Sequence, residues 1–94
     1  MPNFRYYNIE IKKSHNKEIA VTGQIFNDTS KSYSTVGVRL ILYVNNISVA
    51  NVVFAINGLN SGSGKVFEKT IEQLSYDQIG KNINRYELTT ETAF

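Results

Sequence analysis

Residues 57–65, NGLNSGSGK, are the part of the chain that most resembles a phosphate-binding loop. Such a loop needs glycine, four residues and then Gly-Lys followed by Ser or Thr, because the lysine reaches the phosphates and the hydroxyl binds magnesium. Here Leu59 takes the place of the first glycine and Val66 that of the hydroxyl residue. A phosphate loop also opens a helix, whereas a strand is expected after Lys65. We interpret the segment as a connection between strands, with Leu59 as its anchor and Gly62 as its flexible point.

The residues that most often serve in catalysis or metal binding form no recognisable motif. His15 is the single histidine, and it lies in an expected turn without the partners of a metal site or catalytic triad. The carboxylates mostly alternate with apolar residues, which is typical of solvent-facing strand positions. The chain has no cysteine, which excludes thiolate zinc sites and cysteine nucleophiles. We therefore expect no catalytic residue, no metal site and no cofactor, and we predict that the protein is not an enzyme.

The six tyrosines suggest a carbohydrate site, because an exposed tyrosine offers an apolar ring face and a polar edge. Tyr6 and Tyr7 are adjacent in an expected strand, so they must point to opposite faces and one of them is expected to be exposed. Tyrosine is also enriched in strands for reasons of β-propensity alone. The candidate glycan-binding residues are Tyr6, Tyr7 and Tyr33.

A hairpin expected at residues 36–56 is the most apolar part of the chain. Its short connection around Asn45 and Asn46 favours a tight turn, because asparagine tolerates positive φ. A three-residue loop from Val44 to Asn46 would place alternate residues of the second strand on the core face of the first, whereas a two-residue loop would place them on the opposite face. We therefore predict the three-residue loop. The expected core residues are Val36, Val38, Leu40, Leu42, Ala50, Val52, Phe54 and Ile56.

The same register predicts an apolar patch on the outer face of the hairpin. Ile41 would face Val49 across the strands, and Tyr43 would face Ile47. Monomeric proteins rarely leave a large contiguous apolar patch bare, so either the C-terminal segment covers it or a protein partner or second copy does. The candidate partner-binding residues are Ile41, Tyr43, Ile47, Val49 and Val53.

The remaining segments also predict strands. Alternation of apolar and polar residues is clear in residues 3–13 and 19–27, and it is weaker in 65–74 and 83–94. Residues 75–82 can form one helical turn, with Ser75 as its N-cap and Gly80 as its end. Several short strands without a long helix indicate an all-β fold, an immunoglobulin-like antiparallel β-sandwich of about seven strands.

Length and composition limit the possible functions. A chain of 94 residues has the size of a single domain, 1–94, with one core. Its net charge of +2 is too small for the clustered basic surface of nucleic-acid binding proteins. There is no run of eighteen apolar residues, and residues 1–13 lack the order of a signal peptide, so we expect no membrane contact by the chain itself.

The order of landmarks between residues 19 and 71 resembles that of the bacterial and archaeal FxLYD-type domains. In that pattern a Val-x-Gly-x-hydrophobic-x-Asn strand precedes a hydrophobic strand that ends near Leu-Tyr-Asp, a leucine-x-x-glycine turn and a strand with phenylalanine. Leu40 and Val44 stand where the family has its first aromatic residue and its aspartate. The matching residues are Val21, Gly23, Ile25, Asn27, Leu42, Tyr43, Leu59, Gly62 and Phe67.

This resemblance implies an immunoglobulin-like or fibronectin type III-like sandwich in an extracytoplasmic, cell-surface protein. It supplies no catalytic residues. Together with the residue patterns, it leads us to expect a non-catalytic binding or spacer module that acts through protein contact, or homodimerisation, at the face of the 36–56 hairpin. The alternative is a carbohydrate or cell-wall binding module that uses exposed tyrosines.

Overall fold

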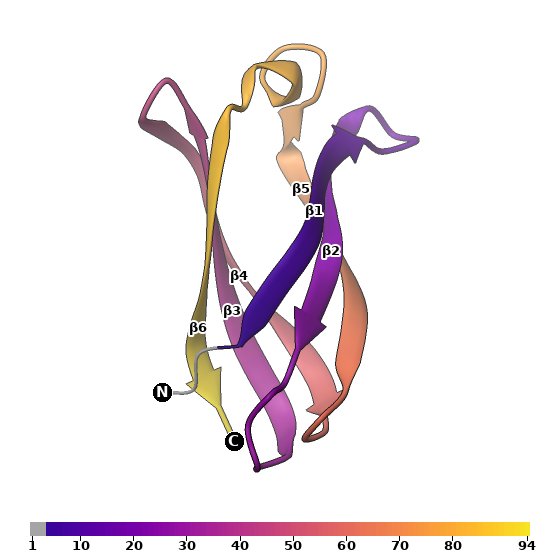
Figure 1. The fold of residues 1–94 in the computed structure, drawn as a ribbon. Coiled ribbons are helices and arrows are strands. Elements are labelled where there is room, and N and C mark those ends of the chain that lie inside the picture. Colours follow the sequence, from indigo (N-terminus) through magenta and orange to yellow (C-terminus); the bar gives the residue numbers. More distant parts are fainter. Residues whose placement is uncertain (1–3) are drawn as a thin grey trace.

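The computed structural model describes residues 4–94, which form two antiparallel sheets of three strands each (Figure 1). One sheet has the order β1-β2-β5 and the other β4-β3-β6. The expected all-β sandwich is confirmed, with six strands in this part of the chain where about seven were predicted. The bounds are β1 Arg5–Lys13, β2 Glu18–Phe26, β3 Tyr33–Val44, β4 Ile47–Leu59, β5 Gly64–Ser75 and β6 Arg85–Ala93, with a 3-10 helix, η1, at Gly80–Asn82.

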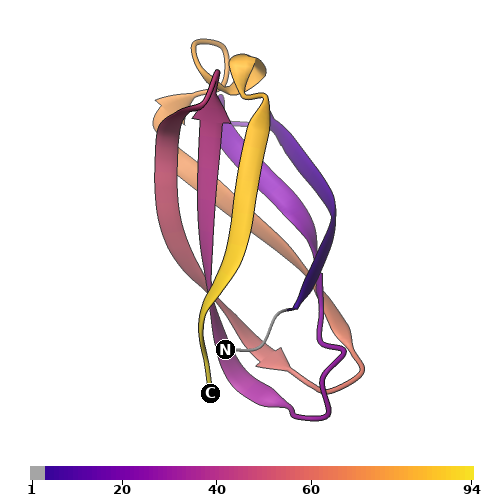
Figure 2. The same cartoon turned by 60° about the vertical axis from the view of Figure 1, so that its left-hand side comes forward.

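The topology is that of an immunoglobulin-like sandwich. The first, second and fifth strands form one sheet, while the third and sixth strands pair in the other, with β4 beside β3 (Figure 2). The chain crosses between the sheets in the segments after β2, β4 and β5. No helix within residues 4–94 has the length and apolar character needed to cross a bilayer.

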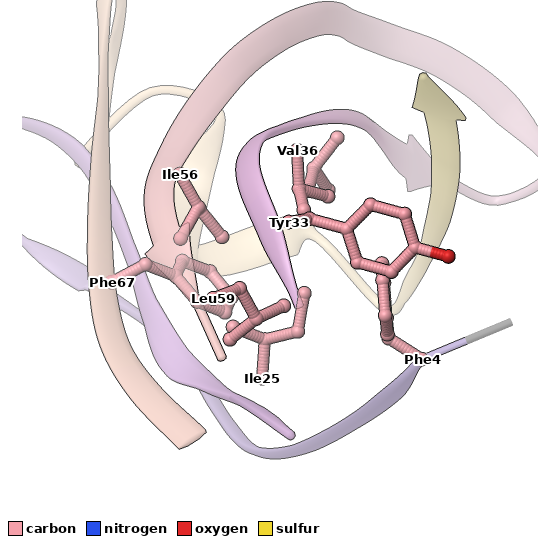
Figure 3. Close-up of a cluster of buried hydrophobic side chains, with 8 residues drawn as sticks. Phe4, Ile25, Tyr33, Val36, Ile56, Leu59 and Phe67 are labelled. Atoms are coloured by element: carbon pink, nitrogen blue, oxygen red, sulfur yellow. The ribbon is translucent and has the colours of Figure 1, made fainter. Parts of the chain in front are cut away.

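The core lies between the sheets and is made by alternate side chains of each strand. In β3 the expected core residues Val36, Val38, Leu40 and Leu42 are fully buried. Leu59 is also fully buried, which confirms its predicted role as an anchor. Figure 3 shows part of this core, where strands of both sheets contribute; its labelled residues are Phe4, Ile25, Tyr33, Val36, Ile56, Leu59 and Phe67.

The β3–β4 hairpin combines a two-residue turn with a β-bulge. Val44 pairs with Ile47, and the turn residues Asn45 and Asn46 have φ values of 49° and 68°. The predicted three-residue loop is therefore wrong. The predicted core face is nevertheless correct, because the register shifts between Leu42 and Tyr43 and restores the alternation that a two-residue turn would have reversed.

A second bulge shapes β1 around Gly23. Tyr7 pairs with Gln24 and Glu10 with Thr22, so two residues of β1 lie opposite Gly23, and one of them, Asn8, has a φ of 55°. A Cβ atom on Gly23 would lie 2.4 Å from Ile9 Cδ1. Gly23 thus lies opposite a bulge and at a close approach of Ile9.

The connection from β5 to β6 contains the predicted short helical segment in a different place. Gly80 begins the 3-10 helix, where the sequence predicted that it would end a turn. Ser75 accepts a 3.4 Å hydrogen bond from the backbone of Gln78 through its hydroxyl, as an N-cap does. Gly80 is needed here because a Cβ would lie 2.5 Å from the ring of Tyr76.

Candidate functional site

The outer face of the β1-β2-β5 sheet carries an aromatic hollow that opens to solvent. Its volume is about 340 Å³. The sheet register builds it, because Tyr7 pairs with Gln24, which pairs in turn with Val66. The lining residues, which define the aromatic hollow, are Tyr7, Gln24, Phe26, Gly62, Ser63, Gly64, Lys65 and Val66.

Strand alternation explains why these side chains face outward. In β2 the buried residues Val21 and Ile25 occupy one face, so Gln24 and Phe26 occupy the other. Tyr7 is 42% exposed and Val66 is 75% exposed, so both side chains are open to solvent. The hollow is thus a shallow surface whose lining mixes apolar and polar groups.

Gly64 forms the low point between the two aromatic residues. A Cβ atom at this position would lie 3.0 Å from the carbonyl oxygen of Ile25 and 3.3 Å from Cδ2 of Phe26. It would lie 3.6 Å from the hydroxyl of Tyr7. Any side chain at residue 64 would therefore occupy the space between the Phe26 ring and the Tyr7 hydroxyl.

Polar groups at the hollow are held in place by neighbours. Asn8 donates a 3.1 Å hydrogen bond to the amide oxygen of Gln24, and the Gln24 amide has two donors in addition to that oxygen. Lys65 donates to the backbone carbonyl of Asn57 in β4. Its ammonium therefore reaches across the edge of the sandwich, and this contact supports the conclusion that the glycine-rich segment is a structural connection.

A second hollow of about 620 Å³ adjoins the first and shares Tyr7 and Phe26 with it. Arg5 and Tyr6 complete its lining. The Arg5 guanidinium lies 3.0 Å from a carboxylate oxygen of Asp28, an ion pair at the surface. Together the two hollows make a continuous aromatic surface along the first half of β1.

Of the three candidate glycan-binding tyrosines, the structure exposes one. Tyr7 lies in the hollow, as the predicted opposition of Tyr6 and Tyr7 requires. Tyr6 turns inward and its hydroxyl lies 2.9 Å from Oγ1 of Thr90; burial raises the pKa of this phenol. Tyr33 is buried edge-on against Phe4, with ring centres 5.6 Å apart. Tyr6 and Tyr33 therefore do not present exposed rings.

The five candidate partner-binding residues do not form the predicted apolar patch. The two-residue turn and the bulge together change the pairs, so that Tyr43 lies opposite Ser48 and Ile41 opposite Asn51. Glu87 of β6 flanks Ile41 on its other side. Val49 packs against the core, while Ile47 and Val53 are exposed at 69% and 49%.

Polar contacts instead cover the outer face of the β4-β3-β6 sheet. Tyr43 donates a 2.6 Å hydrogen bond to Glu87, which raises the pKa of the tyrosine, and the Arg85 guanidinium lies 3.8 Å from the centre of its ring. Arg39 donates to both Glu91 and Asn51. The C-terminal strand β6 therefore covers this face with charged and polar contacts. Coverage by the C-terminal segment was one of the two outcomes that the sequence left open.

The chemical character of the aromatic hollow suits binding. Its lining offers aromatic rings, an amide, a hydroxyl and glycine backbone, and it includes neither a carboxylate nor an imidazole. Among residues 4–94, no three His, Cys, Asp or Glu side chains lie close enough together to hold a metal ion. His15 is an exposed residue of the β1–β2 turn, as predicted.

Sequence reasoning did not single out Gln24, Phe26 or Gly64. One signal was present, because Phe26 is an aromatic residue on the polar face of the segment IAVTGQIF. Gly64 lies in a segment far along the chain, and only the pairing of β2 with β5 brings it beside Phe26.

The sequence matches no protein-family model, and comparisons with curated proteins and with solved structures found no match. The resemblance to FxLYD-type domains therefore stays a prediction.

Proposed function

We propose that the protein is a non-catalytic binding module that holds a carbohydrate chain against the aromatic hollow. One observation carries this proposal: Tyr7 and Phe26 flank Gly64, so two aromatic side chains border a strip of bare backbone. The rest of the lining supplies hydrogen-bonding groups at its margin.

The physical fit is to a pyranose ring. One face of such a sugar presents C–H groups that carry slight positive charge, and aromatic rings attract positive charge to their faces. Hydroxyl groups around the sugar need donors and acceptors, which the Gln24 amide, the Ser63 hydroxyl and the exposed backbone can supply. A shallow, open surface also admits the middle of a long polymer, which a closed pocket would exclude.

The rigidity of the surface favours binding further. Tyr7, Gln24 and Phe26 project from paired strands, and residues fixed by a sheet lose little conformational freedom when a ligand arrives. Asn8 orients Gln24 in the same way.

The place of action that we propose is extracytoplasmic, at the cell surface. Its support is the resemblance to FxLYD-type domains. A wall polysaccharide is a ligand that a surface module would meet in that place.

The test is binding of the purified protein to immobilised peptidoglycan and to an array of bacterial and plant polysaccharides. Tyr7→Ala should abolish binding to the polymers that the wild type retains. Tyr86→Ala is a matched control, because Tyr86 is 43% exposed and lies on the other sheet. Retention by the wild type that Tyr7→Ala leaves unchanged would contradict the proposal, and so would the absence of retention on every polymer.

A further inference from the structure

The sandwich has four edge strands, and one of them differs from the rest in charge. β4 has thirteen residues, ISVANVVFAINGL, and none of them is charged. The other three edge strands carry several charges each. These are Arg5, Glu10, Lys12 and Lys13 in β1, Lys65, Glu68, Lys69 and Glu72 in β5, and Arg85, Glu87 and Glu91 in β6.

Edge strands present unpaired backbone groups, and proteins usually protect them with charges, proline or irregular geometry. β1 is interrupted by its bulge, and the pairing of β6 with β3 shifts register beside Val38. In contrast, β4 pairs with β3 without interruption from Ala50 to Asn57. The free edge of β4 therefore carries no charged residue of its own and is regular over that range.

The side chains next to this edge are compatible with a neighbouring strand. Asn51, Val53 and Ala55 project from the outer face of β4 and are exposed. Val53 is a β-favouring residue and Ala55 is small, and none of the three would bring a charge into a sheet interior.

We propose that β4 pairs antiparallel with β4 of a second copy of this chain. The two sheets then join into one sheet of six strands in the order β6-β3-β4-β4-β3-β6. Within the described chain β4 is the only edge strand without charges, so a second β4 is the matching edge that this protein can supply. A two-fold contact of this kind also limits the assembly to a dimer, because the free edge of β4 is then paired in both copies.

The charge on the neighbouring strand β3 does not oppose this pairing. Arg39 lies in β3 opposite Val53 and already has Glu91 as its ion-pair partner. In the dimer the two Arg39 residues would be three strand spacings apart, roughly 14 Å. That distance exceeds the screening length of about 8 Å at physiological ionic strength.

The first experiment measures the mass of the protein in solution by light scattering across a concentration series. The wild type should reach twice its 10.6 kDa. Val53→Lys should raise the dimer dissociation constant at least about tenfold, because two added lysines would then face each other near the two-fold axis. Thr89→Lys is the matched control: Thr89 is exposed, pairs with the same Arg39 and lies on β6, away from the proposed contact.

A second experiment uses the absence of cysteine from the chain. Val53→Cys should form a disulfide-linked dimer on mild oxidation, and Thr89→Cys should not. Circular dichroism establishes that each variant is folded. A monomeric wild type, a dimer that Val53→Lys leaves unchanged, or crosslinking through Thr89→Cys instead would overturn the proposal. Open-ended filaments would also overturn it, because they require two different edges to pair.

Discussion

The side chain of Asn27 donates a 3.1 Å hydrogen bond to the backbone carbonyl of Leu59. Asn27 is fully buried, and its amide also donates to the carbonyl of Lys31 at 2.8 Å and accepts from the backbone of Thr29 at 3.0 Å. The backbone groups of Asn27 bond to Gly62 and Ser63. One residue therefore joins the loop after β2 to the connection between β4 and β5.

Asn27→Ala should lower the free energy of unfolding by about 2–4 kcal/mol, because it leaves buried carbonyl and N–H groups without partners. Chemical denaturation measures this change. Asn60→Ala, at an exposed position of the β4–β5 connection, is the control and should cost less than about 0.5 kcal/mol. Equal effects of the two variants would show that the Asn27 side chain is not the link between these loops.

Gly23 should be intolerant of a side chain for a steric reason that a second substitution can relieve. In Gly23→Ala the new Cβ would meet Ile9 Cδ1, at 2.4 Å, and Phe67 Cζ, at 3.0 Å, so we expect a loss of about 1–3 kcal/mol. Ile9→Val removes the Cδ1 atom and should restore part of the stability of Gly23→Ala. A double-mutant cycle by denaturation measures this coupling.

Gly62 provides the contrast to Gly23. Its φ is +74°, and a Cβ there would have no atom within 4 Å, so Gly62→Ala is strained only in its backbone. Ile9→Val should give Gly62→Ala no rescue. If it rescued both alanine variants equally, the close approach of Ile9 to Gly23 would not be the cause of the loss.

Lys13 should control the titration of Asp77. The Lys13 ammonium lies 2.9 Å from a carboxylate oxygen of Asp77, and this hydrogen bond holds the pKa of Asp77 below its ordinary value of 3.8. Lys13→Met should therefore raise the pKa of Asp77, as followed by NMR of its side-chain carboxyl.

The lowered pKa of Asp77 also fixes the direction of a pH effect. Since the folded state favours the ionised carboxylate, this pair stabilises the protein above pH 3.8, and the contribution is lost as the pH falls through the lower folded pKa. Lys13→Met should flatten the loss of stability in that acid range. The effect will be small because both side chains are largely exposed. A pKa of Asp77 unchanged by Lys13→Met would contradict this assignment.

The sequence predicted the sandwich and most of its core because alternation in β2 and β3 is strong enough to assign inner and outer faces. Val21, Ile25, Val36 and Leu40 are buried as expected. The length of the turn in the β3–β4 hairpin was harder to predict from the sequence. Asn45 and Asn46 indicated a turn, but the turn length depends on a bulge at Val49 that leaves no mark in the apolar pattern.

The candidate site was predicted only in part. The opposition of Tyr6 and Tyr7 follows from strand geometry, but the choice between them depends on the packing of Tyr6 near Thr90, which is distant in sequence. The apolar patch around Ile41 failed for a related reason. Asn51 and Glu87 lie beside Ile41 because of how β4 and β6 are paired with β3, and local sequence patterns do not determine that pairing.

The most direct test of the proposed glycan surface is an NMR titration of the isotope-labelled protein with soluble oligosaccharides of glucose, mannose and N-acetylglucosamine. At least one of these series should shift the backbone amide of Gly64 and the side-chain amide of Gln24. The amides of Asn51 and Val53 in β4 should stay in place, and Tyr7→Ala should remove the shifts. Shifts centred on β4, shifts that persist in Tyr7→Ala, or no shift with any oligosaccharide would contradict the proposal that the aromatic hollow binds carbohydrate.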